Sequence, residues 1–238
     1  MLHITDSLES LLADTADFFV RQANDAIQNS GKFTVALSGG SSPKLLYTLL
    51  ASDRYSDKVK WEHVYFFFGD ERFVPSNDPQ SNYRMARETL FDPLLITNDK
   101  VFPVNTTVSP AESALLYEQA IKNHLGVAGK FDLILLGLGD NSHTASLFPH
   151  TAVLHEKQSL VKEVFVQEVN QYRITLTAPL INDAKTIAFL VYGKGKADAV
   201  HHILKDPFNP EEYPAQLIQP ISGSVHWFLD KDAASRVA

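Results

Sequence analysis

Three short apolar segments, each followed directly by a polar loop, most strongly limit the folds open to this chain. Residues 33–37 are Phe-Thr-Val-Ala-Leu, residues 64–68 are Val-Tyr-Phe-Phe-Phe, and residues 131–136 are Phe-Asp-Leu-Ile-Leu-Leu. Nearly continuous apolar runs, rather than strict alternation with polar residues, are typical of strands buried on both faces of a parallel sheet. We therefore predict an α/β fold with helices on both faces of the sheet.

Helix signals separate these segments. Asp6 and Glu9 form a capping-box pattern that opens a helix ending at Gly31, and Pro43 stands in the first turn of a second helix. Further helices are expected from about Tyr83, from Ser109-Pro110 and over 196–204, and further strands over 160–166, 173–177, 187–192 and 225–229. The chain has 238 residues and no clear linker. We expect one three-layer domain over 1–238, with a mainly parallel, Rossmann-like sheet.

Composition excludes several classes of protein. The net charge is −7 and the cationic residues are scattered, so no basic surface for nucleic acid is expected. There are no cysteines, which excludes disulfides and a thiol nucleophile. No apolar stretch is long enough for a membrane span, and no basic segment followed by an apolar run opens the chain. We expect a cytoplasmic protein, monomeric or a small homo-oligomer, that needs no metal or cofactor.

The polar loop after the first strand has the composition of an anion cradle. It contains Gly39, Gly40, Ser41 and Ser42 and leads into the helix that Pro43 begins. Glycines let backbone N–H groups approach a ligand, hydroxyls add donors, and a helix N-terminus carries partial positive charge. The loop matches neither the Walker A motif nor the dinucleotide fingerprint. The alternative is an ordinary tight turn between a strand and a helix.

The loops after the other two strands carry charge. Asp70-Glu71-Arg72 directly follows a buried strand, where charged groups must be paired or face a cleft. Arg72 suits bidentate contact with a phosphate, although Asp70 and Arg72 could instead anchor the long loop that reaches Asn82. Ligands of open parallel sheets bind where such loops meet, at the carboxyl ends of the strands.

His143 lies in the loop after the third apolar strand and is the candidate general base. The unperturbed pKa of histidine suits proton transfer near neutral pH, although a lone histidine can also be structural. Arg173 and Lys196, each near one end of a late strand, are further candidates for phosphate contacts. The spacing of the histidines supports no metal site.

Taken together, these motifs resemble the 6-phosphogluconolactonase family. The resemblance rests on Ala36 to Pro43, Gly69 to Pro75 with Ser81-Asn82, His143 to Pro149, Arg173 to Thr177, Gly193 to Val200 and Trp227 to Asp230. It implies hydrolysis of 6-phospho-D-glucono-1,5-lactone, a small phosphorylated sugar lactone, on a fold shared with glucosamine-6-phosphate deaminases. It also implies catalytic roles for His143, Arg72 and Asp70, and substrate contacts for Gly39, Gly40, Ser41, Ser42, Arg72, Asn141, Arg173 and Lys196.

One position departs from the family pattern. The family usually has Asp-Gly before the histidine, whereas this chain has Asn141-Ser142. An amide could still hydrogen-bond the imidazole but would stabilise imidazolium less well than a carboxylate. Asp140, the preceding residue, is a candidate substitute.

Two other functions compete with lactone hydrolysis. A glucosamine-6-phosphate deaminase or isomerase would carry a functional Glu after its histidine, but this chain has the apolar Phe148 there. A sugar-phosphate sensor would be expected to carry a DNA-binding segment or to lack the base. No basic helical extension precedes residue 30, and His143 is present.

Overall fold

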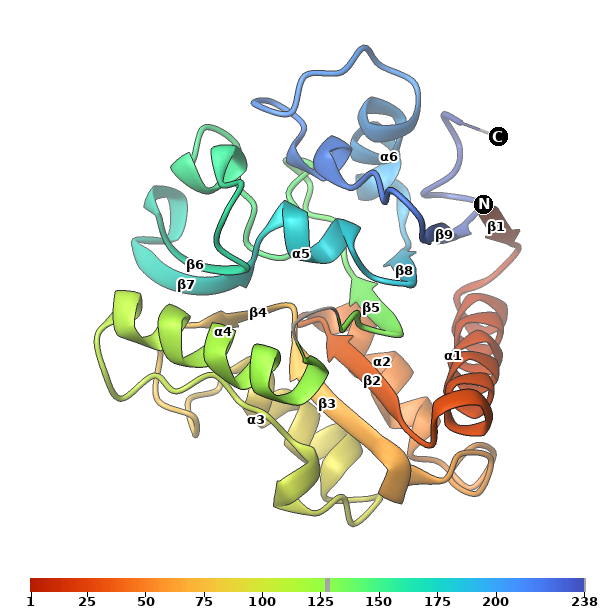
Figure 1. Ribbon diagram of the computed structural model, residues 1–238. Coiled ribbons are helices and arrows are strands. Elements are labelled where there is room, and N and C mark those ends of the chain that lie inside the picture. The colour runs from red at the N-terminus through yellow and green to blue at the C-terminus, as the bar shows by residue number, and fades with distance from the viewer. Residues whose placement is uncertain (127–128, 238) are drawn as a thin grey trace.

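The computed structural model describes residues 1–126 and 129–237 and contains a six-stranded parallel sheet (Figure 1). The strand order is β1-β9-β8-β5-β2-β3. These strands are β1 (Leu2–Thr5), β2 (Phe33–Leu37), β3 (Val64–Phe68), β5 (Leu133–Leu136), β8 (Thr186–Val191) and β9 (Ser224–Asp230). All the pairings between them are parallel. The predicted α/β fold with a mainly parallel sheet is confirmed.

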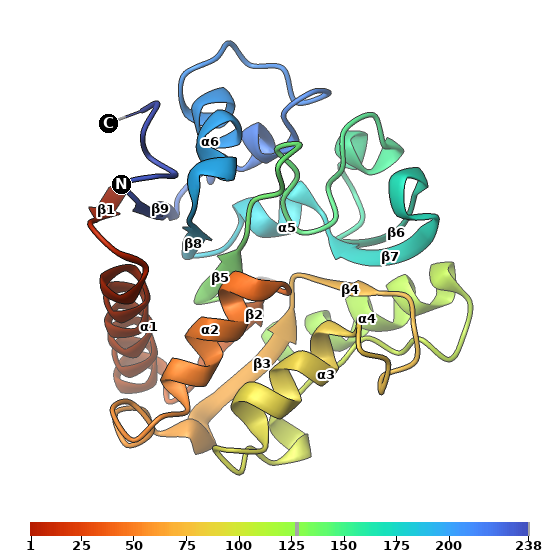
Figure 2. The same ribbon diagram turned by 180° about the vertical axis from the view of Figure 1, so that it is seen from behind.

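Each face of this sheet packs against helices. One core lies beneath α1 (Leu8–Ser30), α2 (Ser41–Leu50) and α3 (Asn82–Ala86), and the other beneath α4 (Pro110–Leu125), α5 (Ala178–Asn182) and α6 (Ala197–Leu204). Figure 2 shows α2 and α3 in front of the strands, while α4 is in front in Figure 1. In β3, Phe66 and Phe68 enter the first core and Phe67 the second. Burial on both faces explains why the strand sequence is apolar at every position.

A second sheet of three antiparallel strands lies beside the first. Its order is β4-β7-β6, with β4 (Asp70–Arg72), β7 (Gln171–Leu176) and β6 (Val161–Val166). The predicted polar loop from Gly69 to Asn82 is therefore wrong at its start, because 70–72 pair with β7. Three consecutive charged residues give no strand signal, and only the partner strand reveals the pairing.

Helix starts follow local capping. The first helix is capped by Ser7, whose hydroxyl accepts from the Ser10 N–H at 3.2 Å, so the predicted cap at Asp6 is wrong by one residue. Gly31 ends this helix with a φ of 75°, as predicted. Arg87–Phe91 continue α3 as a π-helical turn, and 3₁₀ turns occupy Trp61–His63, Asn98–Lys100, Ala152–His155, Gln167–Val169, Lys194–Lys196 and Pro214–Leu217. Within the described ranges, no helix is both long and apolar enough to cross a membrane.

Candidate active site

A cavity of about 260 Å³ opens at the carboxyl ends of the central strands β2 and β5, beside β4 and β7. It brings together segments that are far apart in the sequence. Nine predicted site residues line it: Gly39, Gly40, Ser41, Ser42, Asp70, Arg72, His143, Arg173 and Lys196. Asn141, the remaining predicted residue, is not in the lining and contacts His143 instead. Its predicted contact with the substrate therefore has no support in the geometry.

Tyr47 fixes the start of the loop from Ser38 to Ser42 by hydrogen bonds to the Ser38 backbone. The Tyr47 hydroxyl accepts from the Ser38 N–H at 3.0 Å and donates to the Ser38 carbonyl at 2.8 Å. Burial raises the pKa of Tyr47, so its hydroxyl stays protonated and can donate. Gly40 has a φ of 105°, which favours glycine, and no side chain of residues 1–126 or 129–237 caps the N-terminus of α2 behind it. The first turn of α2 is thus free to bind an anion in the cavity.

Asp70 connects three loops at the cavity wall. Its carboxylate accepts from the Ser146 hydroxyl at 2.7 Å and from the Asn82 amide at 3.3 Å. The Asn82 amide also donates to the Asp70 carbonyl at 2.9 Å. A Cβ added at Gly39 would collide with the Asn82 side chain, so Gly39 is required by this close approach. Asp70 therefore positions the cradle loop and the His143 loop relative to each other.

Glu71 is the residue that anchors the long loop before α3. Only 3% of it is exposed, and it accepts from the backbone N–H groups of Arg72, Asn82 and Tyr83 and from the Ser81 hydroxyl, at 2.7 to 3.1 Å. Burial raises the pKa of Glu71, and the hydrogen bonds partly offset this. The anchoring role that the sequence left open for Asp70 and Arg72 belongs largely to Glu71. Arg72 shares it through one hydrogen bond of 2.6 Å to the Gln80 carbonyl.

Arg72 and Arg173 form a pair of cations across the second sheet. They are directly opposite each other in the β4–β7 register. Arg173 is 9% exposed, and its buried Nε and Nη1 atoms have no hydrogen-bond partner within the described part of the chain. Burial and the Arg72 charge both lower the pKa of Arg173. Like charges in this position are destabilising, and a negatively charged group at Arg173 would satisfy its free N–H groups.

The His143 ring is fixed by close packing. It stacks on Phe148 with 3.9 Å between ring centroids, and a Cβ added at Gly139 would collide with it. Ser142 and Ala145, on either side in sequence, have φ values of 63° and 47°. Non-glycine residues in this left-handed region cost about 1–3 kcal/mol each. The chain therefore tolerates two strained backbone conformations next to this imidazole, and the positive φ at 142 is one that glycine would adopt without strain.

The electrostatics of His143 favour the neutral base. Its Nδ1 lies 2.5 Å from the Asn141 Oδ1, which can only accept, so Nδ1 carries the proton and Nε2 is free to accept another. Burial lowers the pKa of His143 to about 4, and the charges of Lys196 and Arg173 add to this while Asp70 opposes it. The imidazole is therefore unprotonated near neutral pH.

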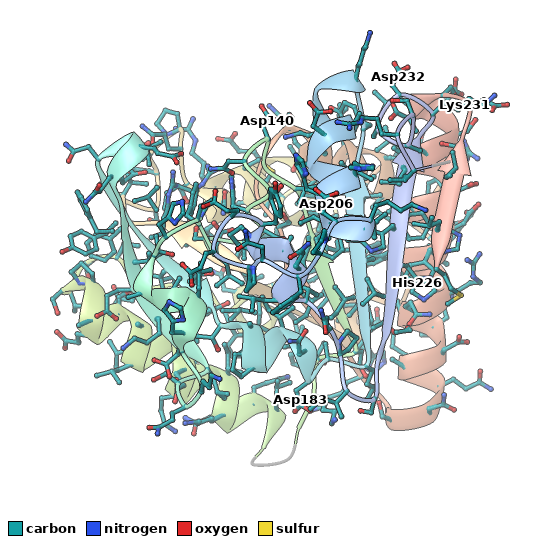
Figure 3. All side chains as sticks on the ribbon, turned by 90° about the horizontal axis from the view of Figure 1, so that it is seen from above. Asp140, Asp183, Asp206, His226, Lys231 and Asp232 are labelled. Carbon is teal, nitrogen blue, oxygen red and sulfur yellow. The ribbon has the colours of Figure 1, made fainter. Side chains whose placement is uncertain are left out.

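Lys196 and Asp140 form an ion pair at the cavity mouth. Their Nζ and Oδ1 atoms are 2.5 Å apart, and Lys196 precedes α6 rather than lying within it as predicted. Figure 3 shows Asp140 beside this helix. Among the described residues Asp140 makes its hydrogen bond to Lys196 rather than to His143, and it acts on His143 only through its charge, which raises the pKa of the imidazole.

Several residues that shape the site were not predicted as site residues. Asn82, Ser146, Phe148 and Gly139 all occur within or next to the quoted motifs, but nothing in the sequence shows which neighbour each contacts. Only the glycine at 139 offered a signal, since a glycine in a polar loop can mark a close approach. Among the described residues, no group of three or more His, Asp or Glu side chains could hold a metal ion.

Comparisons with known proteins identify relatives of this chain and of its fold. The family model described as glucosamine-6-phosphate isomerases/6-phosphogluconolactonase matches residues 6–227. The chain is 42% identical to the 6-phosphogluconolactonase of Synechocystis, over 89% of this chain and 88% of that protein. The crystal structure of the devB protein is 33% identical with a TM-score of 0.90, covering 100% of both chains. The 6-phosphogluconolactonase of Trypanosoma brucei is 30% identical with a TM-score of 0.85, covering 100% of this chain and 98% of that one. The chain belongs to the family of glucosamine-6-phosphate isomerases and 6-phosphogluconolactonases.

Proposed function

We propose that this protein hydrolyses 6-phospho-D-glucono-1,5-lactone to 6-phospho-D-gluconate in the oxidative pentose phosphate pathway. The observation that carries the proposal is a neutral His143 in the same cavity as Arg173, whose buried Nε and Nη1 atoms have no partner among the described residues. A lactone carbonyl is already electrophilic, so a positioned base and stabilisation of the oxyanion are sufficient for its hydrolysis. We place this reaction in the cytoplasm, since an acidic, cysteine-free chain suits a reducing compartment.

The phosphate and the lactone ring occupy different parts of the cavity in this proposal. Arg72 lies next to Gly40 and Ser41, with which it also lines a neighbouring hollow. These groups, at the free N-terminus of α2, hold the phosphate. Arg173 and Lys196 lie close enough to lower the pKa of His143, so they face the carbonyl end.

The reaction then proceeds by general base catalysis. His143 Nε2 takes a proton from a water molecule whose oxygen attacks C1 of the lactone, and negative charge develops on the carbonyl oxygen beside Arg173 and Lys196. As the tetrahedral intermediate collapses, the bond from C1 to the ring oxygen breaks. The imidazolium returns its proton to that oxygen, the new carboxylic acid releases its own proton to solvent, and the product leaves as an open-chain carboxylate. Asp70 holds the loops that position these groups.

Phe148 separates this chemistry from the isomerase and deaminase reactions of the same family. Its ring is stacked on His143 and is buried. An aromatic hydrocarbon cannot relay a proton, whereas ring opening and deamination of an amino sugar require such a relay. Phe148 therefore leaves His143 without a neighbouring proton relay, which hydrolysis does not need and deamination does.

Freshly generated 6-phosphogluconolactone is expected to be consumed well above its spontaneous rate, while glucosamine 6-phosphate releases no ammonia. The assay follows acid release from the lactone in the presence and absence of protein, because uncatalysed hydrolysis sets the background. Rates equal to that background, or production of ammonia, would overturn the proposed function.

Replacing Ser41 with aspartate is expected to raise the KM for the lactone by at least tenfold. A carboxylate at the first turn of α2 would repel the phosphate and occupy the free N–H groups that hold it. Titration with 6-phosphogluconate measures the loss of affinity directly, and Thr48→Asp on the exposed part of the same helix provides the charge-matched control. Unchanged affinity in Ser41→Asp would place the phosphate elsewhere.

A further inference from the structure

A hydrogen-bonded chain leads from His143 through Asn141 to Glu168. We propose that Glu168 is a positioning residue for the hydrolysis: its carboxylate selects the orientation of the Asn141 amide, and that orientation fixes the tautomer of His143. The inference rests on the proposed function, because it concerns the base of that reaction. It assigns a role to a residue in the turn between β6 and β7, outside the cavity lining.

An amide at position 141 creates a problem that a carboxylate does not have. Both oxygens of an aspartate accept, so either orientation favours the tautomer with a proton on Nδ1. An asparagine has one accepting and one donating end. If its amide turned by 180°, the NH₂ group would face Nδ1 and favour the tautomer with the proton on Nε2. That tautomer could not take a proton from water at the cavity side.

The contacts around Asn141 select the productive orientation. The Asn141 Oδ1 is 2.5 Å from His143 Nδ1, and the Asn141 Nδ2 donates to Glu168 Oε2 at 3.4 Å. Since a carboxylate can only accept, Glu168 favours the NH₂ group on its own side and the oxygen on the imidazole side. Glu168 is the residue that provides this acceptor, because the adjacent Asp140 is paired with Lys196.

A second contact acts in the same direction. The backbone N–H of His143 also donates to the Asn141 Oδ1, at 3.3 Å. Removing Glu168 therefore weakens the preference without abolishing it. Because more than half of the Asn141 amides would still face the productive way, the expected loss of kcat is at most about twofold.

Two pairs of variants test this role. Glu168→Ala is expected to lower kcat by up to about twofold in the natural background, with little change in KM. In the Asn141→Asp background, Glu168→Ala is expected to leave kcat unchanged. Both oxygens of an aspartate accept, so its side chain does not have to be held in one orientation. Glu168→Gln, which keeps an accepting oxygen, is expected to retain most of the wild-type kcat. Glu62→Ala, at the opposite end of the sheet and largely exposed, is the matched control and should leave kcat unchanged.

The ¹⁵N shifts of the His143 ring provide an independent readout. In wild-type protein they should report a proton on Nδ1, and in Glu168→Ala a measurable fraction should move to Nε2. Wild-type kcat in Glu168→Ala, an equal loss in both backgrounds, or an unchanged tautomer would each overturn the inference. A wild-type protein that fails to exceed spontaneous lactone hydrolysis would overturn the proposed function instead, while the tautomer measurement would still judge Glu168.

Discussion

Replacing His143 with alanine is expected to lower kcat for lactone hydrolysis about 10²- to 10⁴-fold, the range that a positioned general base contributes. Affinity for 6-phosphogluconate should change little, because the proposed phosphate site at Gly40, Ser41 and Arg72 does not include His143. Steady-state kinetics with background subtraction and calorimetric titration of the product separate the two effects.

The control for this variant is His150→Ala. His150 belongs to the same stretch of chain, but its side chain is 64% exposed and contacts Glu212 rather than the cavity. The pH profile gives a second check: with a His143 pKa of about 4, the base stays unprotonated down to that pH, and wild-type kcat/KM should fall only as the pH drops through it. Undiminished turnover in His143→Ala would remove the imidazole from the mechanism.

The parts of the fold that could be predicted from the sequence are those fixed by local patterns. The strands at 33–37 and 64–68 begin and end as predicted, since apolar runs bounded by polar loops need no information from distant residues. β4 was missed because its three charged residues resemble a loop, and β1, four residues at the edge of the sheet, was missed because it is short. Both strands exist through pairing with segments far along the chain.

The site divides in the same way. The topology of parallel sheets made it reasonable to treat the polar loops as one site, and the motifs shared with the family named the cavity residues, including Arg173 on the antiparallel second sheet. How the cavity residues are held in place could not be predicted from the sequence. The anchoring by Glu71, the collision that requires Gly39, and the contact between Asn141 and Glu168 depend on side-chain packing, and the last of these spans 27 positions of sequence.

Replacing Arg173 with methionine is expected to lower kcat/KM about 10²- to 10³-fold, the cost of removing one preorganised group that stabilises an oxyanion. Its free energy of unfolding should be unchanged or higher. Methionine has a similar length. The substitution removes two buried nitrogen atoms that lack partners among the described residues, and it also removes the charge repulsion between Arg173 and Arg72. Kinetics and denaturant titration of the same preparations measure the two quantities.

Opposite changes in activity and stability distinguish a functional arginine from a structural one. Glu71 does not depend on Arg173 for its hydrogen bonds, since backbone N–H groups and the Ser81 hydroxyl supply them. Arg236→Met, which removes an exposed arginine paired with Asp198, controls for the loss of one positive charge and should leave kcat/KM unchanged. A destabilised Arg173→Met with full activity would assign Arg173 to the fold. A stable but inactive variant would show that the chain keeps an unpaired, buried cation because the transition state supplies the missing charge.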